Sequence, residues 1–121
     1  MSGSSDIIVR REKFQLPSGV PCDALHFRNG LVLLISLNAL ALYKNAQSVF
    51  DPLGNGMLAL EDIEDDLQAD AEGNIVQEYQ AGYVGLSGGK VILITPNDIQ
   101  LFPNKEAALR NKNEITRIKL A

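Results

Sequence analysis

Acidic side chains form the most conspicuous chemical feature of this sequence. No lysine or arginine occurs from Asn45 through Gly89, and nine acids fall in that stretch. The nine are Asp51, Glu61, Asp62, Glu64, Asp65, Asp66, Asp70, Glu72 and Glu78. Clustered carboxylates repel one another, and either a divalent cation or a basic partner relieves that repulsion.

The beginning of this stretch can be aligned with a calcium-binding loop of 12 residues. Asp51 and Asn55 take positions 1 and 5, and Gly56 takes position 6, where such loops bend sharply. Leu53 at position 3 offers no oxygen, and position 12 is Asp62 instead of the longer glutamate. These departures disfavour an EF-hand and favour a site of another geometry. Its candidate Ca²⁺ ligands are Asp51, Asn55, Glu61, Asp62, Asp65 and Asp66.

The sequence contains few candidates for a catalytic nucleophile and base. Cys22 and His26 are the only thiol and the only imidazole. Four residues apart on a strand, they would be separated by about 13 Å, too far for a hydrogen bond. Neither a phosphate-binding loop nor a dinucleotide fingerprint is present. The sequence therefore predicts no catalytic and no cofactor-binding residues, and we expect a protein that is not an enzyme.

All 11 basic residues lie outside the acidic stretch. Seven of them could form a basic face: Arg10, Arg11, Lys13, Arg28, Lys112, Arg117 and Lys119. The net charge is nevertheless −4, and the chain contains only three tyrosines, four phenylalanines and no tryptophan. This balance disfavours nucleic acid as a partner.

Composition places the chain among ordinary globular proteins. Its 121 residues, 45% hydrophobic and 21% charged, are typical of a single domain. A lone cysteine argues against a disulfide-framed secreted domain. The longest apolar stretch, 31–43, is shorter than the roughly 20 residues that a membrane-spanning helix needs. Residues 1–5 are typical of a flexible start without a signal peptide. We therefore expect a cytoplasmic protein with no membrane partner.

Two segments of the chain are similar to each other. Residues 30–50 and 89–109 align without gaps at an offset of 59, and seven of the 21 positions are identical. The identical pairs are Gly30/Gly89, Val32/Val91, Leu34/Leu93, Ile35/Ile94, Asn38/Asn97, Leu42/Leu101 and Asn45/Asn104. Shared hydrophobicity does not explain the matched asparagines, so the pattern indicates an internal repeat.

Each repeat predicts a hairpin, a turn, a third strand and a short helix. Asn29-Gly30 and Gly88-Gly89 favour tight turns between strands. The predicted strands are 23–28, 32–35 and 39–43 in the first repeat, and 80–86, 91–94 and 98–102 in the second. Asn104 is placed to cap a helix over 105–110, and 46–50 is its weaker counterpart.

Three further elements lie outside the repeats. The charged segment 7–16 is typical of an edge strand, and 114–120 has the spacing of a half-buried strand. In the acidic stretch, Leu60, Ile63 and Leu67 have the spacing of one helix face, which predicts an acidic helix over 61–70.

These elements predict one mainly β (α+β) domain over 1–121, a small β-barrel or sandwich. Two pseudo-symmetric hairpin-strand-helix repeats, about 22–50 and 81–109, would flank an acidic insert, 51–78, that carries the helix. The hairpin-plus-strand unit is similar to small β-barrel adaptor modules such as the PRC-barrel. The similarity concerns the fold and implies no functional residues.

The function that this pattern favours is a small intracellular, non-enzymatic interaction or regulatory module. Its acidic segment 51–72 would bind a protein with a basic face, or a second copy of the chain by self-association. The alternative is a calcium-binding protein that uses the same carboxylates, with Ca²⁺ as its one expected cofactor.

Overall fold

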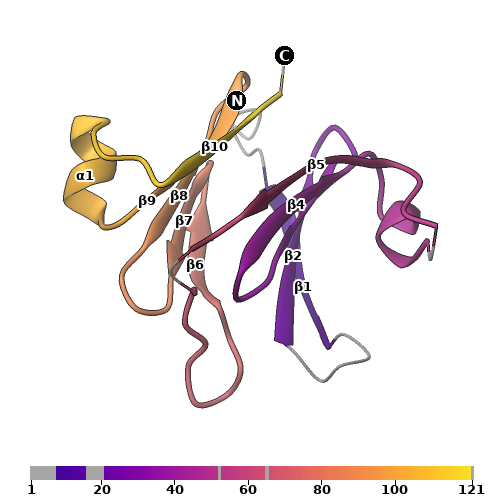
Figure 1. Cartoon of the computed structure of the whole chain (residues 1–121), viewed down its shortest axis with the longest axis horizontal. Coiled ribbons are helices and arrows are strands. Elements are labelled where there is room, and N and C mark those ends of the chain that lie inside the picture. The colour runs from indigo at the N-terminus through magenta and orange to yellow at the C-terminus, as the bar shows by residue number, and fades with distance from the viewer. Residues whose placement is uncertain (1–7, 16–20, 52, 65, 121) are drawn as a thin grey trace.

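A computed structural model of the chain describes residues 8–15, 21–51, 53–64 and 66–120. Within these residues the protein is mainly β, with two five-stranded antiparallel sheets and one α-helix (Figure 1). The predicted flexible start, 1–5, lies outside the described residues. No helix in the described part of the chain has both the length and the apolar character needed to cross a membrane.

The first sheet contains the first five strands in chain order, each paired with the next. They are β1 (Ile8–Gln15), β2 (Pro21–Phe27), β3 (Val32–Ile35), β4 (Ala39–Tyr43) and β5 (Met57–Asp62). A short 3₁₀ helix, η2 (Gln47–Phe50), lies between β4 and β5. Because the order is sequential, β1 and β5 form the two edges of this sheet.

The second sheet repeats the sequential arrangement with the second half of the chain. Its strands are β6 (Val76–Gln80), β7 (Tyr83–Leu86), β8 (Val91–Ile94), β9 (Asp98–Phe102) and β10 (Thr116–Lys119). The helix α1 (Lys105–Arg110) lies between β9 and β10. The edges of this sheet are β6 and β10.

Glycine turns start the corresponding strands of the two sheets. Gly30 precedes β3 with φ of 95°, and Gly89 precedes β8 with φ of 101°. In each turn the glycine N–H donates to a carbonyl three residues earlier, that of Phe27 (3.0 Å) or Leu86 (3.1 Å). Glycine adopts such positive φ values without strain, which explains why these dipeptides predicted the turns correctly.

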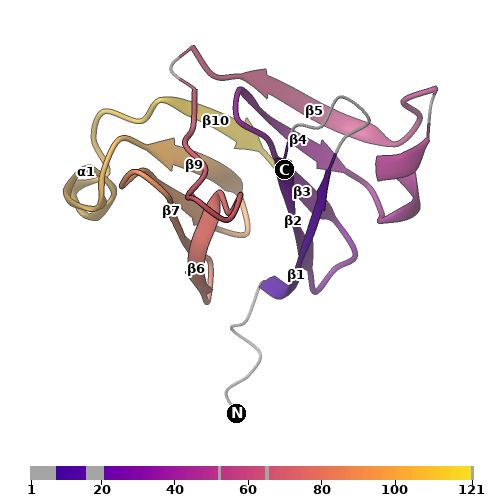
Figure 2. The same ribbon diagram turned by 90° about the horizontal axis from the view of Figure 1, so that it is seen from below.

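The main core lies between the two sheets, which face each other (Figures 1 and 2). It takes 18 buried residues from both sheets and from the segment that links them. Two smaller clusters lie apart from it, one with Val49 of η2 packed against it and one containing Ala107 and Ala108 of α1. The described strands form two separate sheets, so the predicted single small barrel is not observed.

Several predicted elements are confirmed with their predicted bounds: β3, β4, β8, β9 and α1. Asn104 caps α1 as expected, because its side-chain oxygen accepts a hydrogen bond from the Ala107 N–H. The predicted strand over 80–86 is wrong in part. A turn at Ala81 and Gly82, with φ of 48° and 94°, divides it into the end of β6 and the whole of β7. Alanine is an unusual residue for positive φ, so only the glycine of this pair indicated a turn in the sequence.

The predicted acidic helix over 61–70 is wrong. Glu61 and Asp62 end strand β5, and the described residues from 63 to 70 contain no helix. The segment crosses the end of the first sheet, where the Ile63 and Leu67 N–H groups donate to the carbonyls of Asn38 and Leu37. Ile63 and Leu67 are nevertheless buried in the main core, although the described residues around them are not helical. The acidic stretch 51–78 is therefore not an inserted helix, because it includes β5 and the start of β6.

Candidate interaction surface

Strand β5 is an edge strand whose sequence is unusually apolar for that position. It pairs with β4 from Ala39 opposite Asp62 to Tyr43 opposite Met57, and no described strand pairs with its other edge. Met57, Leu58 and Leu60 are 41%, 56% and 52% exposed. Edge strands are usually protected by charge or by a covering element, because their free backbone groups can pair with another chain. On β5 that protection is weak.

The two faces of β5 have different roles. Ala59 packs against the main core, and Glu61 Oε1 accepts a hydrogen bond of 2.9 Å from the Thr116 hydroxyl of β10. Leu60 and Asp62, which alternate with these two residues, are exposed on the opposite face. A bulge leaves Leu58 without a partner residue on β4. The strand thus holds the two sheets together with one face and presents leucines to solvent with the other.

The segment before β5 continues this apolar surface. Phe50 and Leu53 are 67% and 82% exposed. Asp51 shapes the loop, since its Oδ1 accepts the Leu53 N–H at 2.9 Å and its carbonyl accepts the Gly54 N–H at 3.0 Å. We call Phe50, Leu53, Met57, Leu58 and Leu60, together with Asp51 and Asp62, the β5 surface.

Lys44 lies at the beginning of this strand. Its backbone N–H donates to the Gly56 carbonyl at 2.8 Å. Gly56 has φ of 88°, and a Cβ built on it would lie 3.2 Å from Lys44 Cε and would overlap Ser48. The lysine side chain therefore extends alongside Gly56 and places a positive charge at the Met57 end of β5, while Asp62 places a negative charge at the other end.

The candidate calcium ligands fall on both sides of β5. Asp51 and Asn55 precede the strand, whereas Asp62 and Asp66 end or follow it. A strand of six residues separates the two groups by about 17 Å. Glu61 faces β10, and Asp65 lies outside the described residues. Among the residues that the structure describes, no three His, Cys, Asp or Glu side chains are placed to hold a metal ion.

Asp70, in the segment between β5 and β6, has a lowered pKa. Hydrogen bonds lower the pKa of Asp70 to about 2, with the largest effect from the Gln77 side chain and the next from the Asn74 N–H. The corresponding distances are both 2.9 Å. These bonds connect Asp70 with residues of the same turn and with the start of β6, so its carboxylate stabilises the segment that links the two sheets.

A buried carboxylate that the sequence did not single out joins the sheets. Asp23 of β2 is fully buried, and its Oδ2 accepts the N–H groups of Ile75 (2.9 Å) and Val76 (2.8 Å) at the start of β6. Arg11 Nη1 donates to the Val76 carbonyl at 2.8 Å, and Lys13 Nζ to the Glu72 carbonyl at 3.1 Å. Two of the predicted basic residues are thus used to hold the link between the sheets.

Cys22 and His26 lie in different surroundings. Cys22 is buried in a small apolar cluster that contains Ala24 of the same strand. Burial raises the pKa of the Cys22 thiol, and the adjacent Asp23 carboxylate raises it further, which disfavours the reactive thiolate. His26 Nε2 lies 3.1 Å from Glu12 Oε1 and 3.2 Å from Arg10 Nη2. The structure therefore does not bring the thiol and the imidazole together.

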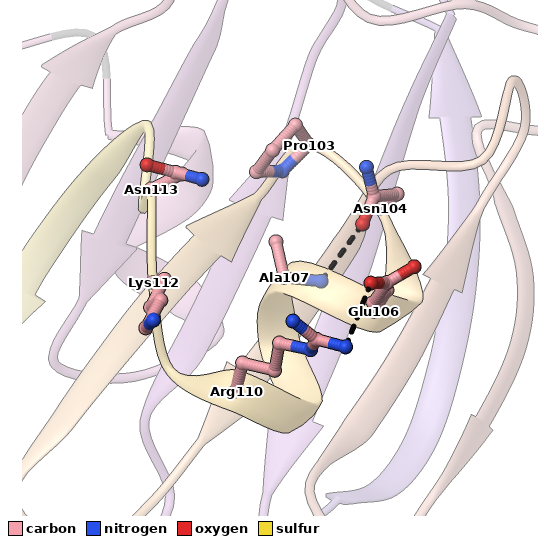
Figure 3. Close-up of a pocket in the computed structure, with 7 residues that line it drawn as sticks. All are labelled: Pro103, Asn104, Glu106, Ala107, Arg110, Lys112 and Asn113. Atoms are coloured by element: carbon pink, nitrogen blue, oxygen red, sulfur yellow. Dashed lines mark hydrogen bonds and ion pairs between the residues drawn. The ribbon is translucent and has the colours of Figure 1, made fainter.

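A polar hollow of about 280 Å³ lies beside α1 (Figure 3). Its lining residues are Pro103, Asn104, Glu106, Ala107, Arg110, Lys112 and Asn113. Asn104 is engaged as the helix cap, and Glu106 Oε1 lies 3.2 Å from Arg110 Nη2. The hollow is thus formed largely by groups that stabilise the short helix.

Comparison with known proteins gives no match: no family model fits the chain, and no curated protein and no solved structure is significantly similar to it.

Proposed function

We propose that the protein is a small cytoplasmic, non-enzymatic interaction or regulatory module whose working surface is the acidic segment 51–72. The observation that carries this proposal is the β5 surface, where exposed leucines lie on an unpaired edge strand. Exposed Asp62 and Asp66 lie at one end of it, and Asp51 lies at the other. Apolar side chains supply affinity, and the surrounding charge supplies partner choice and rate of association.

The partner that this surface favours is a protein with a basic face. No lysine or arginine lies between Asn45 and Gly89, so all of the charged side chains within the segment are negative. Such a field attracts a basic partner over about 8 Å at physiological salt. The seven candidate basic residues include Arg11 and Lys13, which are engaged at the link, and Arg117, which lies 3.0 Å from Glu114 and 3.6 Å from Asp98. These contacts support the choice of a protein over nucleic acid.

A two-fold repetition of one unit is the second part of this proposal. The bounds of β3 and β8, and those of β4 and β9, differ by 59 residues. Asn45 Oδ1 accepts the Ser48 N–H at 2.9 Å, and Asn104 Oδ1 accepts the Ala107 N–H at 2.8 Å. The strands that follow the two units differ in sequence, since β5 reads MLALED and β10 reads TRIK. This difference supports a specialised role for β5, which follows the first unit.

The test is affinity capture from a lysate of the source cells with two matched variants. Asp62→Asn/Asp66→Asn removes two exposed charges from the segment. Glu78→Gln/Glu106→Gln removes two exposed charges elsewhere. Proteins retained by the wild type and by the control, but lost by the first variant and at about 0.5 M salt, would support the proposal. Equal retention by all three proteins would contradict it.

Calcium binding is the alternative function of the same segment. Glu61, Asp62, Glu64 and Asp66 fall within six residues, and a cation would relieve their mutual repulsion. Calorimetric titration with Ca²⁺ at about 0.15 M salt, with Mg²⁺ as control, decides this point. Saturable heat with Ca²⁺ alone, lost in Asp62→Asn/Asp66→Asn, would favour the alternative, and absence of heat would remove it.

A further inference from the structure

The four edges of the two described sheets are not equally protected. The β1 edge carries Arg10, Arg11, Glu12 and Lys13, and the β10 edge carries Arg117 and Lys119. The β6 edge, VQEYQ, is mainly polar. The β5 edge is different, because its first four residues, Met57 to Leu60, are apolar and Glu61 faces β10. An apolar edge strand of this length exposes backbone groups that can pair with another chain, and a second strand that pairs with it covers them.

We propose that the occupant of this edge is β5 of a second copy of the chain, which pairs antiparallel about a two-fold axis. The inference rests on the proposed function, because it names the partner of the same surface. Two-fold dimers are the commonest protein oligomers, and in such a dimer one surface contacts itself. The question is therefore whether the β5 surface is complementary to itself.

The sequence of β5 is self-complementary when the axis passes through Ala59. In this register Leu58 of one copy lies opposite Leu60 of the other, and the reverse pair forms across the axis. Directly opposed residues on antiparallel strands share a face, so the four exposed leucines would cover one another. An axis at Glu61 would instead place two glutamates opposite each other, which disfavours that register.

The charged residues at the two ends of β5 are also complementary in this register. Asp62 of one copy lies opposite Gly56 of the other, and Lys44 extends alongside that glycine. The negative end of each β5 therefore meets the positive end of its partner. Lys44 and Asp62 are both exposed in the single chain, so the two ion pairs form only in the dimer. The bulge leaves Leu58 without a partner on β4, and the second copy supplies one.

Sedimentation velocity from about 5 to about 200 µM protein tests the dimer, because its population depends on concentration. We expect a transition from 13.2 kDa to twice that mass. Leu60→Asp should keep the protein monomeric throughout this range. Leu109→Asp, at a leucine of α1 that is 78% exposed, is the matched control and should dimerise as the wild type does. A monomeric wild type, or equal effects of the two variants, would overturn the proposal.

Charge reversal tests the register. Asp62→Lys alone and Lys44→Glu alone should each weaken the dimer about tenfold, since each places like charges together twice. An equimolar mixture of the two variants should dimerise as tightly as the wild type. In the mixed dimer the two reversed charges pair at one end of the interface, and the unchanged Asp62 and Lys44 pair at the other. A mixture as weak as the single variants would exclude this register.

These outcomes are independent of the capture experiment. A protein that is monomeric but retains a basic partner through Asp62 and Asp66 would contradict the dimer and leave the interaction module standing. A dimer that retains no other protein would support self-association as the whole activity of the surface.

Discussion

The Asp23 side chain joins strand β2 of the first sheet to the start of the second sheet. It is fully buried, and its Oδ2 accepts the N–H groups of Ile75 and Val76. Asp23→Ala leaves both donors buried without an acceptor, so we expect the free energy of unfolding to fall by about 3 kcal/mol. Urea denaturation followed by circular dichroism measures this loss.

Two further variants separate the causes of this effect. Asp23→Asn keeps one oxygen acceptor and should lose about half as much stability as Asp23→Ala. Asp66→Ala removes an exposed acid and should change stability by less than about 0.5 kcal/mol. If Asp23→Ala were as mild as Asp66→Ala, the two hydrogen bonds would not be what holds the start of β6.

Asp70 predicts a pH dependence of stability. Hydrogen bonds from Gln77, Asn74 and Glu72 lower the pKa of Asp70 from 3.8 to about 2. Because the folded pKa lies below the unfolded one, the stabilisation is complete above pH 3.8 and disappears as the pH falls through 2. The stability difference between the wild type and Asp70→Asn should therefore be constant from pH 5 to 7 and shrink at lower pH.

Thermal denaturation of the two proteins at matched pH values measures this difference, and Asp66→Asn is the control for loss of a charge. NMR titration of the Asp70 carboxyl group gives the folded pKa directly. A value near 3.8 would show that the turn from 70 to 77 does not hold the carboxylate as described.

At the scale of elements, the two asparagines that precede η2 and α1 make corresponding contacts. Asn45 Oδ1 accepts the Ser48 N–H and Asn104 Oδ1 accepts the Ala107 N–H. Replacing either with alanine removes a backbone hydrogen bond at the start of a short helix, and in Asn45 also the bond from the Ser48 hydroxyl, so each change should cost about 1 kcal/mol. Urea denaturation of Asn45→Ala, Asn104→Ala and the double variant measures the costs, and they should add because the sites lie in different sheets.

Asn111→Ala and Lys112→Ala are the controls for this pair. Asn111 ends α1 with φ of 54°, so its replacement should also be costly, whereas that of exposed Lys112 should be nearly neutral. If Asn45→Ala were silent while Asn104→Ala was costly, the two units would not share this contact.

Local signals in the sequence predicted the elements that depend on local chemistry. The turns at residues 30 and 89 have positive φ, which glycine adopts without strain, and the Asn104 side chain caps α1 by accepting the N–H of Ala107. The positions of β3, β8 and α1 could therefore be predicted from nearby residues. β5 could not be located in this way. Its residues suggested a calcium loop and the start of a helix, and only pairing with β4 makes them a strand. Tertiary pairing overrides local propensity in strands more often than in helices.

The charge pattern of the sequence indicated the segment that carries the candidate surface, but not that an edge strand forms it. The absence of basic residues from 45 to 89 indicates the acidic segment, but the spacing of Leu60 with Ile63 and Leu67 predicts a helix face in place of an edge strand. Asp23 was missed for a related reason, because its partners are more than 50 residues away in the chain. No pattern within β2 shows that its aspartate will be buried.

At the scale of the whole molecule, the two sheets share one core and neither has a sufficient core of its own. Nine of the 18 residues in the main core precede residue 70, and nine follow it. A sheet deprived of its partner would expose this entire apolar face to water, which a half of this size cannot offset. We therefore expect that fragments 1–71 and 72–121, separated within the turn between Asp70 and Asn74, do not fold alone.

Mixing the two fragments should restore the fold. The buried contacts of both sheets, together with the Asp23 hydrogen bonds to Ile75 and Val76, then form between separate chains. Two-dimensional NMR of each labelled fragment, alone and with its unlabelled complement, measures this directly. A dispersed spectrum should appear only in the equimolar mixture, and Asp23→Ala in the first fragment should weaken its assembly. A dispersed spectrum from either fragment as a monomer would show that each sheet is a domain, and the shared core would then not be the source of stability.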